Sequence, residues 1–202
     1  MRLRQIQLIL WSAAAVAAAS VAAVFVWQQT AQQAPGTDTG QAFRADFELT
    51  DHLGTVRKDE DFAGKWLLVF FGFTNCPDVC PTTLSEVAAV MDGLGDGTDR
   101  VQPLFVSIDP ERDTPAAMAE FVPLFDAGIV GLTGTPDQIA ATAESFFVYY
   151  EEIEEAAAPG GYAMSHTSQL FLFDPEGEFV KTYPYGTAAE VILADLEERM
   201  AG

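Results

Sequence analysis

The sequence predicts an α/β domain, a sheet covered by helices on both faces, that follows one transmembrane helix. Two observations carry this prediction. Short apolar segments of strand type alternate along the chain with segments of helical spacing, which is the pattern of an α/β sheet. Before them, residues 8–27 form a 20-residue apolar run broken only by Ser12 and Ser20. A helix of that length spans about 30 Å, the thickness of a bilayer's hydrocarbon core.

Residues 1–28 are predicted to form an uncleaved membrane anchor. Arg2 and Arg4 precede the apolar run and no Lys or Arg follows it until Arg44, so the positive-inside rule places the N-terminus in the cytoplasm. A cleaved signal peptide is the alternative, but its apolar core usually has only about 7–15 residues. No Arg-rich and Ser-rich presequence precedes the run. We therefore expect a single-pass protein of the bacterial inner (cytoplasmic) membrane with its C-terminal domain in the periplasm.

Residues 29–41 are polar and aperiodic, and they are predicted to be a flexible linker to a domain at 42–202. All 30 acidic residues but only eight of the 10 basic ones follow the anchor, which gives this part of the chain a net charge near −22. Such a charge argues against binding to nucleic acid or to an anionic membrane surface. It would suit a cation or a basic partner, and it would equally serve solubility.

The first half of the domain is predicted to contain, in order, a hairpin (43–49 and 55–57), a strand (66–71), a helix (79–94), a strand (101–108) and a helix (115–125). The run WLLVFF at 66–71 is apolar throughout, as a central strand buried on both faces requires. Leu84, Val87 and Met91 fall on one face of the first helix. Thr114 followed by a proline is typical of a helix start.

The second half is predicted to contain a short strand (128–132), a helix (136–147), an acidic loop (151–161), two strands (169–173 and 178–182) and a final helix that Thr187 caps and that ends at Met200. The sequence Asp-Pro-Glu-Gly at 174–177 is a strong turn signal between the last two strands. A late hairpin and helix after strand–helix alternation again indicate an α/β sheet.

The chain's two cysteines, Cys76 and Cys80, stand between the strand at 66–71 and the helix at 79–94. The positive end of a helix stabilises a thiolate. Two intervening residues would give the thioredoxin redox motif, whereas the three found here place the sulfurs at i and i+4, on one helical face if the turn is helical. Such a pair can clamp a metal ion or close a disulfide, and two thiolates favour soft Cu(I). A purely structural disulfide is the alternative.

A third ligand would have to come from a small set, because the chain has only two histidines, His52 and His166. His166 stands just before the strand predicted at 169–173. In a thioredoxin-like sheet the loop before that strand lies beside the N-terminus of the cysteine helix, so His166 is a candidate ligand. A structural histidine is the alternative. His52, in the turn of the first hairpin, is expected to be exposed and without a role in binding.

Three motifs make the sequence resemble the SCO/SenC family of copper chaperones for cytochrome c oxidase. They are FGFTNCPDVCP at 71–81, SIDPERDTP at 107–115, and SHT at 165–167 ahead of DPEG at 174–177. The resemblance implies a thioredoxin-like fold with an N-terminal β-hairpin extension. It also implies one copper ion, as Cu(I) or Cu(II), bound by Cys76, Cys80 and His166. Asn75 stands where the family often has His, and Ser165 stands where it usually has Asp.

The resemblance implies a copper chaperone that delivers copper to, or prepares, the binuclear copper (CuA) site of a haem–copper cytochrome oxidase. Its partners would be the oxidase's copper-site subunit, a second periplasmic copper carrier and a thioredoxin-like reductant. Such a metallochaperone is not an enzyme. The alternative is a thiol–disulfide reductase that uses Cys76 and Cys80 as a redox-active pair without metal. A peroxiredoxin-type peroxidase ranks third, since no Arg lies near Cys76 in the sequence.

Overall fold

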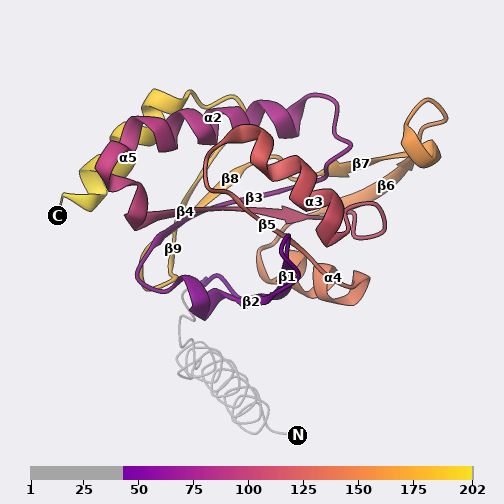
Figure 1. Ribbon diagram of the computed structural model, residues 1–202, viewed down its shortest axis with the longest axis horizontal. Coiled ribbons are helices and arrows are strands. Elements are labelled where there is room, and N and C mark those ends of the chain that lie inside the picture. The colour runs from indigo at the N-terminus through magenta and orange to yellow at the C-terminus, as the bar shows by residue number, and fades with distance from the viewer. Residues whose placement is uncertain (1–42, 202) are drawn as a thin grey trace, which may run out of the picture. The chain divides into compact units, whose positions relative to one another are not determined.

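The computed structural model describes residues 43–201, in which a seven-stranded sheet has the order β2-β1-β5-β4-β3-β8-β9 and a second, two-stranded sheet pairs β6 with β7 (Figure 1). The strands are β1 (Glu48–Asp51), β2 (Val56–Lys58), β3 (Trp66–Gly72), β4 (Val101–Ser107), β5 (Val130–Thr133), β6 (Tyr150–Glu154), β7 (Tyr162–His166), β8 (Leu170–Phe173) and β9 (Phe179–Tyr183). The helices are α2 (Val79–Leu94), α3 (Pro115–Phe121), α4 (Pro136–Ser145) and α5 (Ala189–Met200), with 3-10 turns η1 (Asp59–Phe62), η2 (Gly95–Arg100), η3 (Val122–Phe125) and η4 (Pro159–Gly161). The predicted α/β class is confirmed.

Strand β3 lies inside the sheet, next to the central strand β4, and pairs in parallel with β4 and antiparallel with β8. Every residue of β3 is buried, as the apolar run at 66–71 predicted. The N-terminal hairpin is also confirmed. Its strand β1 pairs with β2 and, on its other side, with β5, so the hairpin extends the sheet at one edge.

Adjacent phenylalanines of β3 point to opposite faces of the sheet, which shows where the helices pack. The Phe70 ring stacks on Phe105, with centroids 6.2 Å apart, and Phe105 contacts Phe121 at the end of α3. The Phe71 ring packs edge-on against Phe146, which directly follows α4, at 5.1 Å. Helices α2 and α5 lie against each other on the face of the sheet that α3 also covers (Figure 1). Helices therefore cover both faces, as predicted.

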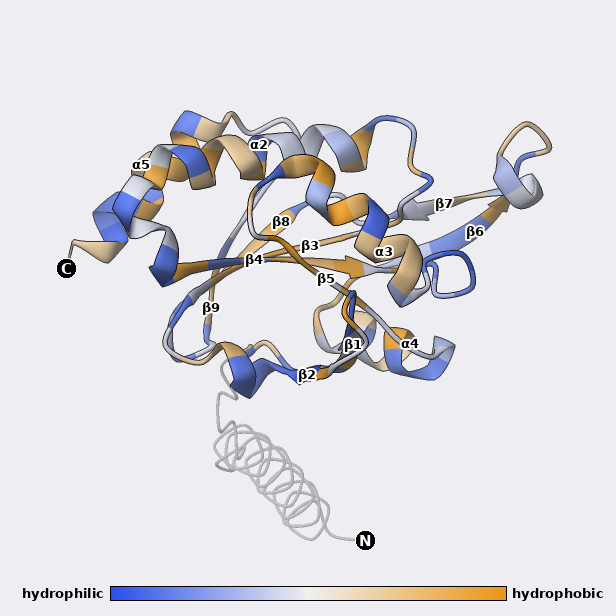
Figure 2. Ribbon diagram, viewed as in Figure 1, coloured by the Kyte–Doolittle hydropathy of each residue, from blue (hydrophilic) through white to orange (hydrophobic). Residues whose placement is uncertain are grey.

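The prediction of a loop at 151–161 was wrong for its first residues. They form β6, which pairs with β7 in the register Tyr150↔His166 to Glu154↔Tyr162. Figure 2 shows why the sequence hid this strand: β6 is hydrophilic, in contrast to the apolar strands at the centre of the main sheet. Strand β6 is almost wholly exposed and buries no face, so it has no alternation of apolar and polar residues to detect.

Two smaller predictions were also wrong. Thr187 does not cap the last helix, because its hydroxyl donates to the carbonyl of Pro184, and α5 begins after Ala188 instead. The backbone N–H of Ala189, the first residue of α5, donates to the Glu86 carboxylate of α2 at 2.9 Å. His52 is half-buried rather than exposed, since its Nδ1 accepts from the Gly131 N–H at 3.1 Å and so joins the first hairpin to β5.

The predicted anchor (1–28) and linker (29–41) both precede the residues that the structure describes, so both remain predictions. Between residues 43 and 201, none of the helices combines the length and the apolar character needed to cross a bilayer.

Candidate metal centre

The two cysteines lie at the junction of β3 and α2, where the sequence predicted them. Both are free thiols. Cys80 is in the first turn of α2 and is fully buried, whereas Cys76 precedes the helix and is half-buried. The backbone N–H of Cys80 points to the Cys76 sulfur at 3.4 Å. The sulfur of Cys76 therefore occupies the anion-binding position at the helix N-terminus.

The surroundings of the pair give the two thiols opposite acidities. A hydrogen bond from the Cys80 thiol, together with backbone N–H groups, lowers the pKa of Cys76 to about 4 even though burial opposes the shift. The same contact with Cys76, together with burial, raises the pKa of Cys80. At neutral pH the pair therefore carries one thiolate, on Cys76, and one proton, on Cys80.

His166 meets this pair from the end of β7. Its Nε2 lies 3.8 Å from the Cys80 sulfur, and its Nδ1 lies 2.9 Å from the Thr167 carbonyl oxygen. Because a carbonyl oxygen only accepts, Nδ1 carries the proton and Nε2 keeps its lone pair toward the sulfur. The ring packs edge-on against Phe70 and Phe73, with centroids 6.0 and 6.1 Å away. Ligating histidines commonly have this arrangement, one nitrogen facing the metal and the other bonded to a carbonyl.

These donors fit a soft metal ion. Metal–sulfur and metal–nitrogen bonds of about 2.3 and 2.0 Å, meeting at about 120°, hold sulfur and nitrogen about 3.7 Å apart, close to the distance between Cys80 and His166. Among residues 43–201, no three His, Cys, Asp or Glu side chains yet lie close enough together to hold a metal ion. The donors are instead in hydrogen-bond contact, and a bound ion would replace those bonds.

Gly72, at the end of β3, is a residue whose importance the sequence reasoning missed. A Cβ atom at this position would lie 2.7 Å from the Cys80 sulfur and 2.9 Å from a ring carbon of Phe105, both too close for a real contact. The missing side chain is what leaves room for the buried thiol. A glycine at the end of an otherwise apolar strand, four residues before a cysteine, was the available signal.

A buried carboxylate behind the cysteines was also missed. Asp113 accepts hydrogen bonds from the Thr74 N–H at 3.0 Å, the Thr74 hydroxyl at 2.5 Å and the Ser107 hydroxyl at 2.7 Å. Burial raises the pKa of Asp113, although these bonds oppose the shift. The bonds fix the segment that leads into Cys76. The available signal was a pair of aspartates, Asp109 and Asp113, in the loop after a buried strand.

The unequal thiols give a testable prediction. Because the pKa of Cys76 is about 4, its thiolate persists as pH falls from 8 to 5, and its alkylation by iodoacetamide should lose rate only near pH 4. An ordinary thiol, with a pKa of about 8.5, loses about tenfold in rate per pH unit below that value. Cys80 should stay unlabelled in the folded chain, and peptide mapping after timed labelling checks both statements. Equal labelling of the two thiols would contradict this assignment, as would a tenfold drop in the labelling rate of Cys76 for each pH unit below 8. Denatured protein, in which both thiols should react, is the control.

Several known proteins resemble this chain in sequence and in fold. The family model described as SCO1/SenC matches residues 35–201. The chain is 42% identical over 164 residues to the mitochondrial protein SCO2 homolog of Bos taurus, an alignment that covers 78% of this chain and 60% of that protein. The chain therefore spans less than two thirds of the length of this curated relative.

Two solved structures share the fold. Arabidopsis thaliana ScoI, solved with copper bound, superimposes with a TM-score of 0.73 at 34% identity, covering 79% of this chain and 99% of that one. Bradyrhizobium japonicum ScoI, also solved with copper bound, gives a TM-score of 0.71 at 40% identity, covering 77% and 98%. The fold is the thioredoxin-like fold of these proteins, and the chain belongs to the SCO1/SenC family.

Proposed function

We propose that this chain is a copper chaperone that holds one copper ion through Cys76, Cys80 and His166. In this role it would deliver copper to, or prepare, the CuA site of a haem–copper cytochrome oxidase. One observation carries the proposal: the free Nε2 lone pair of His166 lies 3.8 Å from the sulfur of Cys80, while Nδ1 is bonded to a backbone carbonyl. A dithiol that only exchanges disulfides has no need of an oriented imidazole. The two relatives solved with copper bound support the choice of metal.

The unequal thiols suggest how the cargo is taken up and released. Cys76, already a thiolate and half-buried, meets incoming Cu(I) first. Cys80 then loses its proton as its sulfur joins the metal, because only the thiolate is a ligand. On release, thiolates of the receiving protein replace Cys76 and then Cys80, and Cys80 takes a proton back. The copper stays Cu(I), and no electron moves.

The reductase alternative has its own supporting observation. A lowered pKa at the half-buried Cys76, above a buried and protonated Cys80, is the arrangement of an attacking thiolate with a resolving thiol. Cys76 would attack a partner disulfide, and Cys80 would then displace the partner's thiolate as the Cys76–Cys80 disulfide forms. The two roles are compatible, since a site that receives copper on cysteines must first be reduced.

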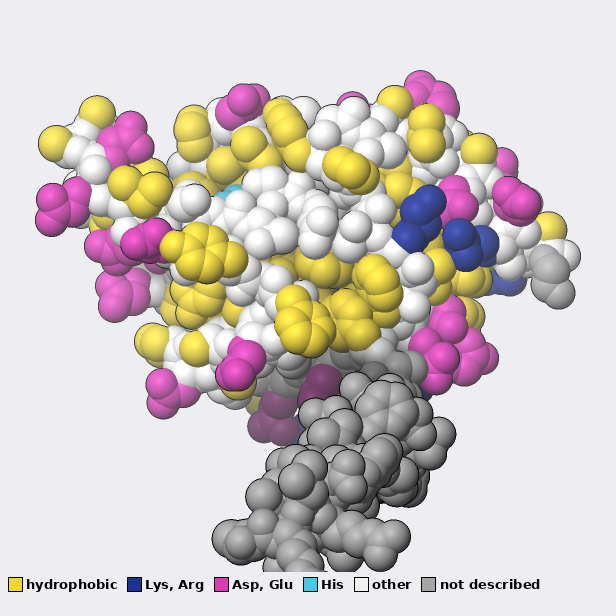
Figure 3. Space-filling view, turned by 180° about the vertical axis from the view of Figure 1, so that it is seen from behind, with side chains coloured by type: hydrophobic (Ala, Val, Ile, Leu, Met, Phe, Trp, Pro, Cys, Tyr) yellow, Lys and Arg dark blue, Asp and Glu magenta, His cyan; other side chains and the backbone are white. Residues whose placement is uncertain are grey.

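Placement in the cell forms part of the same proposal. The anchor at 1–28 and the linker at 29–41 would hold the domain at 42–202 on the periplasmic side of the inner membrane, within reach of the oxidase subunit that receives copper. A second copper carrier and a thioredoxin-like reductant would supply metal and electrons. Figure 3 shows acidic side chains around the rim of one face of the domain, hydrophobic and uncharged side chains across its middle, and Lys and Arg gathered on one side. Such a surface suits basic protein partners and not nucleic acid.

Copper stoichiometry tests the proposal. The full chain, purified without a histidine tag and reduced under anaerobic conditions, should bind one Cu(I) per molecule. The bound metal should protect Cys76 from alkylation, because the thiolate is then committed to the ion. Chain that has been oxidised to the Cys76–Cys80 disulfide is the control and should bind none. A reduced chain that takes up no copper, yet reduces a small disulfide, would favour the reductase.

A further inference from the structure

The hairpin β6–β7, which carries His166 as its last residue, is separate from the main sheet. Residues of β6 are mostly exposed and those of β7 half-buried, and the hairpin's apolar contacts with the core come from two partly buried side chains, Tyr150 and Met164. A lone two-stranded hairpin is marginally stable in water. Contacts from elsewhere in the chain must therefore fix its orientation, and with it the position of His166.

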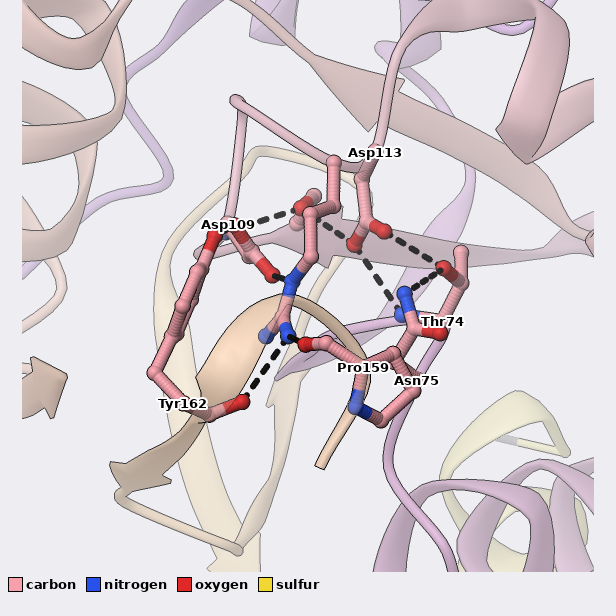
Figure 4. Close-up of polar contacts among 8 residues, drawn as sticks. Thr74, Asn75, Asp109, Asp113, Pro159 and Tyr162 are labelled. Atoms are coloured by element: carbon pink, nitrogen blue, oxygen red, sulfur yellow. Dashed lines mark hydrogen bonds and ion pairs between the residues drawn. The ribbon is translucent and has the colours of Figure 1, made fainter. Parts of the chain in front are cut away.

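Arg112, in the loop between β4 and α3, makes those contacts. Its Nη1 donates to the carbonyl oxygens of Pro159 and Tyr162, at 2.7 and 2.9 Å, on the segment that enters β7. Its guanidinium carbon lies 3.7 Å from the centre of the Tyr162 ring. Its Nε forms an ion pair with Asp109 of the same loop, which is labelled in Figure 4. One side chain thus joins the hairpin to the domain through several directed bonds.

The partners of Arg112 are themselves fixed. Asp109 is buried and also accepts from the Tyr162 hydroxyl at 3.0 Å, so two residues of one loop, Asp109 and Arg112, bond to the hairpin. The Asp109 N–H donates to the Ser107 hydroxyl at 3.0 Å, and that hydroxyl donates to Asp113. Asp113 holds Thr74, two residues before Cys76. The loop from β4 to α3 therefore contacts both the segment that carries the cysteines and the hairpin that carries the histidine (Figure 4).

We propose that Arg112 is a positioning residue, which sets where His166 lies relative to Cys76 and Cys80 by holding the β6–β7 hairpin against the β4–α3 loop. The expected effect of Arg112 on copper affinity rests on the proposed function. Its effect on the position of the His166 ring does not. Groups that orient metal ligands typically change metal affinity by about 10- to 100-fold when they are altered.

Arg112→Lys is the variant that separates orientation from charge. Lysine keeps the positive charge beside Asp109, so no buried carboxylate is left unpaired, but one ammonium group cannot also reach both hairpin carbonyls. The matched control is Arg44→Lys. Arg44 likewise bonds a backbone carbonyl, that of Glu176, and pairs with Glu178, and its loop is not in the hairpin network.

The first readout needs no copper. The His166 ring packs against Phe70 and Phe73, so its ring resonances report its position through the ring currents of those neighbours. In the full chain with 13C-labelled histidine, Arg112→Lys should shift the His166 signals and leave those of His52 in place. Arg44→Lys should shift neither. If the His166 signals of Arg112→Lys stay where they are in the parent chain, the inference is wrong, whatever the chain does with copper.

The second readout is Cu(I) affinity in a double-mutant cycle. Arg112→Lys should weaken Cu(I) binding about 10- to 100-fold in the parent chain and cause no further loss in a His166→Ala background, because it acts through the imidazole. An equal loss in both backgrounds would mean a general structural role and would overturn the inference.

Tyr162→Phe, which removes only the hydroxyl bond to Asp109, provides a milder test of the same kind should Arg112→Lys fail to fold. A parent chain that binds no copper would contradict the proposed function. The His166 resonances would still test whether Arg112 positions the imidazole.

Discussion

Replacing either Cys76 or Cys80 by serine is expected to abolish tight Cu(I) binding. A serine hydroxyl is a hard, protonated donor at neutral pH, and a single thiolate with one imidazole makes a poor site for a soft ion. The loss of Cu(I) affinity should therefore exceed about 100-fold, which is the largest loss typical when a residue that only orients a metal ligand is altered. Competition titration of the reduced chain against a Cu(I) chelator measures the change.

The two serine variants should differ in their effect on stability. Cys80 is fully buried beside Gly72, close to the rings of Phe70 and Phe105, so Cys80→Ser places a hydroxyl among apolar side chains, whereas Cys76 is half-buried. We expect Cys80→Ser to lower the free energy of unfolding by about 1 kcal/mol and Cys76→Ser to change it less. Thermal melting of both variants is the control for folding. A folded variant that still binds one Cu(I) with the parent affinity would exclude that cysteine as a ligand.

Replacing His166 by alanine is expected to reduce copper affinity and to change the Cu(II) spectrum, because a nitrogen donor is lost. The remaining dithiol should still reduce a small disulfide. Affinity of the parent chain should also fall in acid, since a protonated imidazole has no lone pair to donate, and His166→Ala should lose that part of the pH dependence. The half-buried ring contacts Phe70 and Phe73, so its removal should cost about 1 kcal/mol of stability without unfolding the domain.

His52→Ala is the matched control, with one structural consequence. Because His52 accepts a hydrogen bond from the Gly131 N–H, its loss should lower the free energy of unfolding by about 1 kcal/mol while copper affinity and spectrum stay as they are. If His166→Ala instead kept the parent affinity and spectrum but lost reductase activity, the imidazole would not be a ligand. The reductase would then become the leading function.

Local patterns in the sequence were enough to predict the centre of the fold and the place of the cysteines. The apolar run of β3 predicts a strand buried on both faces wherever it lies, because no other position shields such a run from water. Thr114 and Pro115 predict the start of α3 from backbone chemistry alone, and the Thr114 hydroxyl does accept from the third residue of that helix. Cys76 and Cys80 follow β3 and meet α2 directly, so their position at a helix N-terminus also follows from neighbours in the chain.

Only the tertiary structure decided the contacts between residues that lie far apart in the chain. Arg112 meets the hairpin 47 and 50 residues later, and Cys80 meets His166 after 86 residues. No spacing rule reaches across such distances. The strand β6 left no pattern because it buries no face, and His52 looked exposed because its partner Gly131 arrives from another strand. The sequence by itself determined which segments must be buried and which side chains could bind a soft metal, because burial and ligand chemistry are properties of residues and their near neighbours. Where the imidazole and the sulfurs meet, and what holds them there, depended on how the sheet and the separate hairpin pack in space.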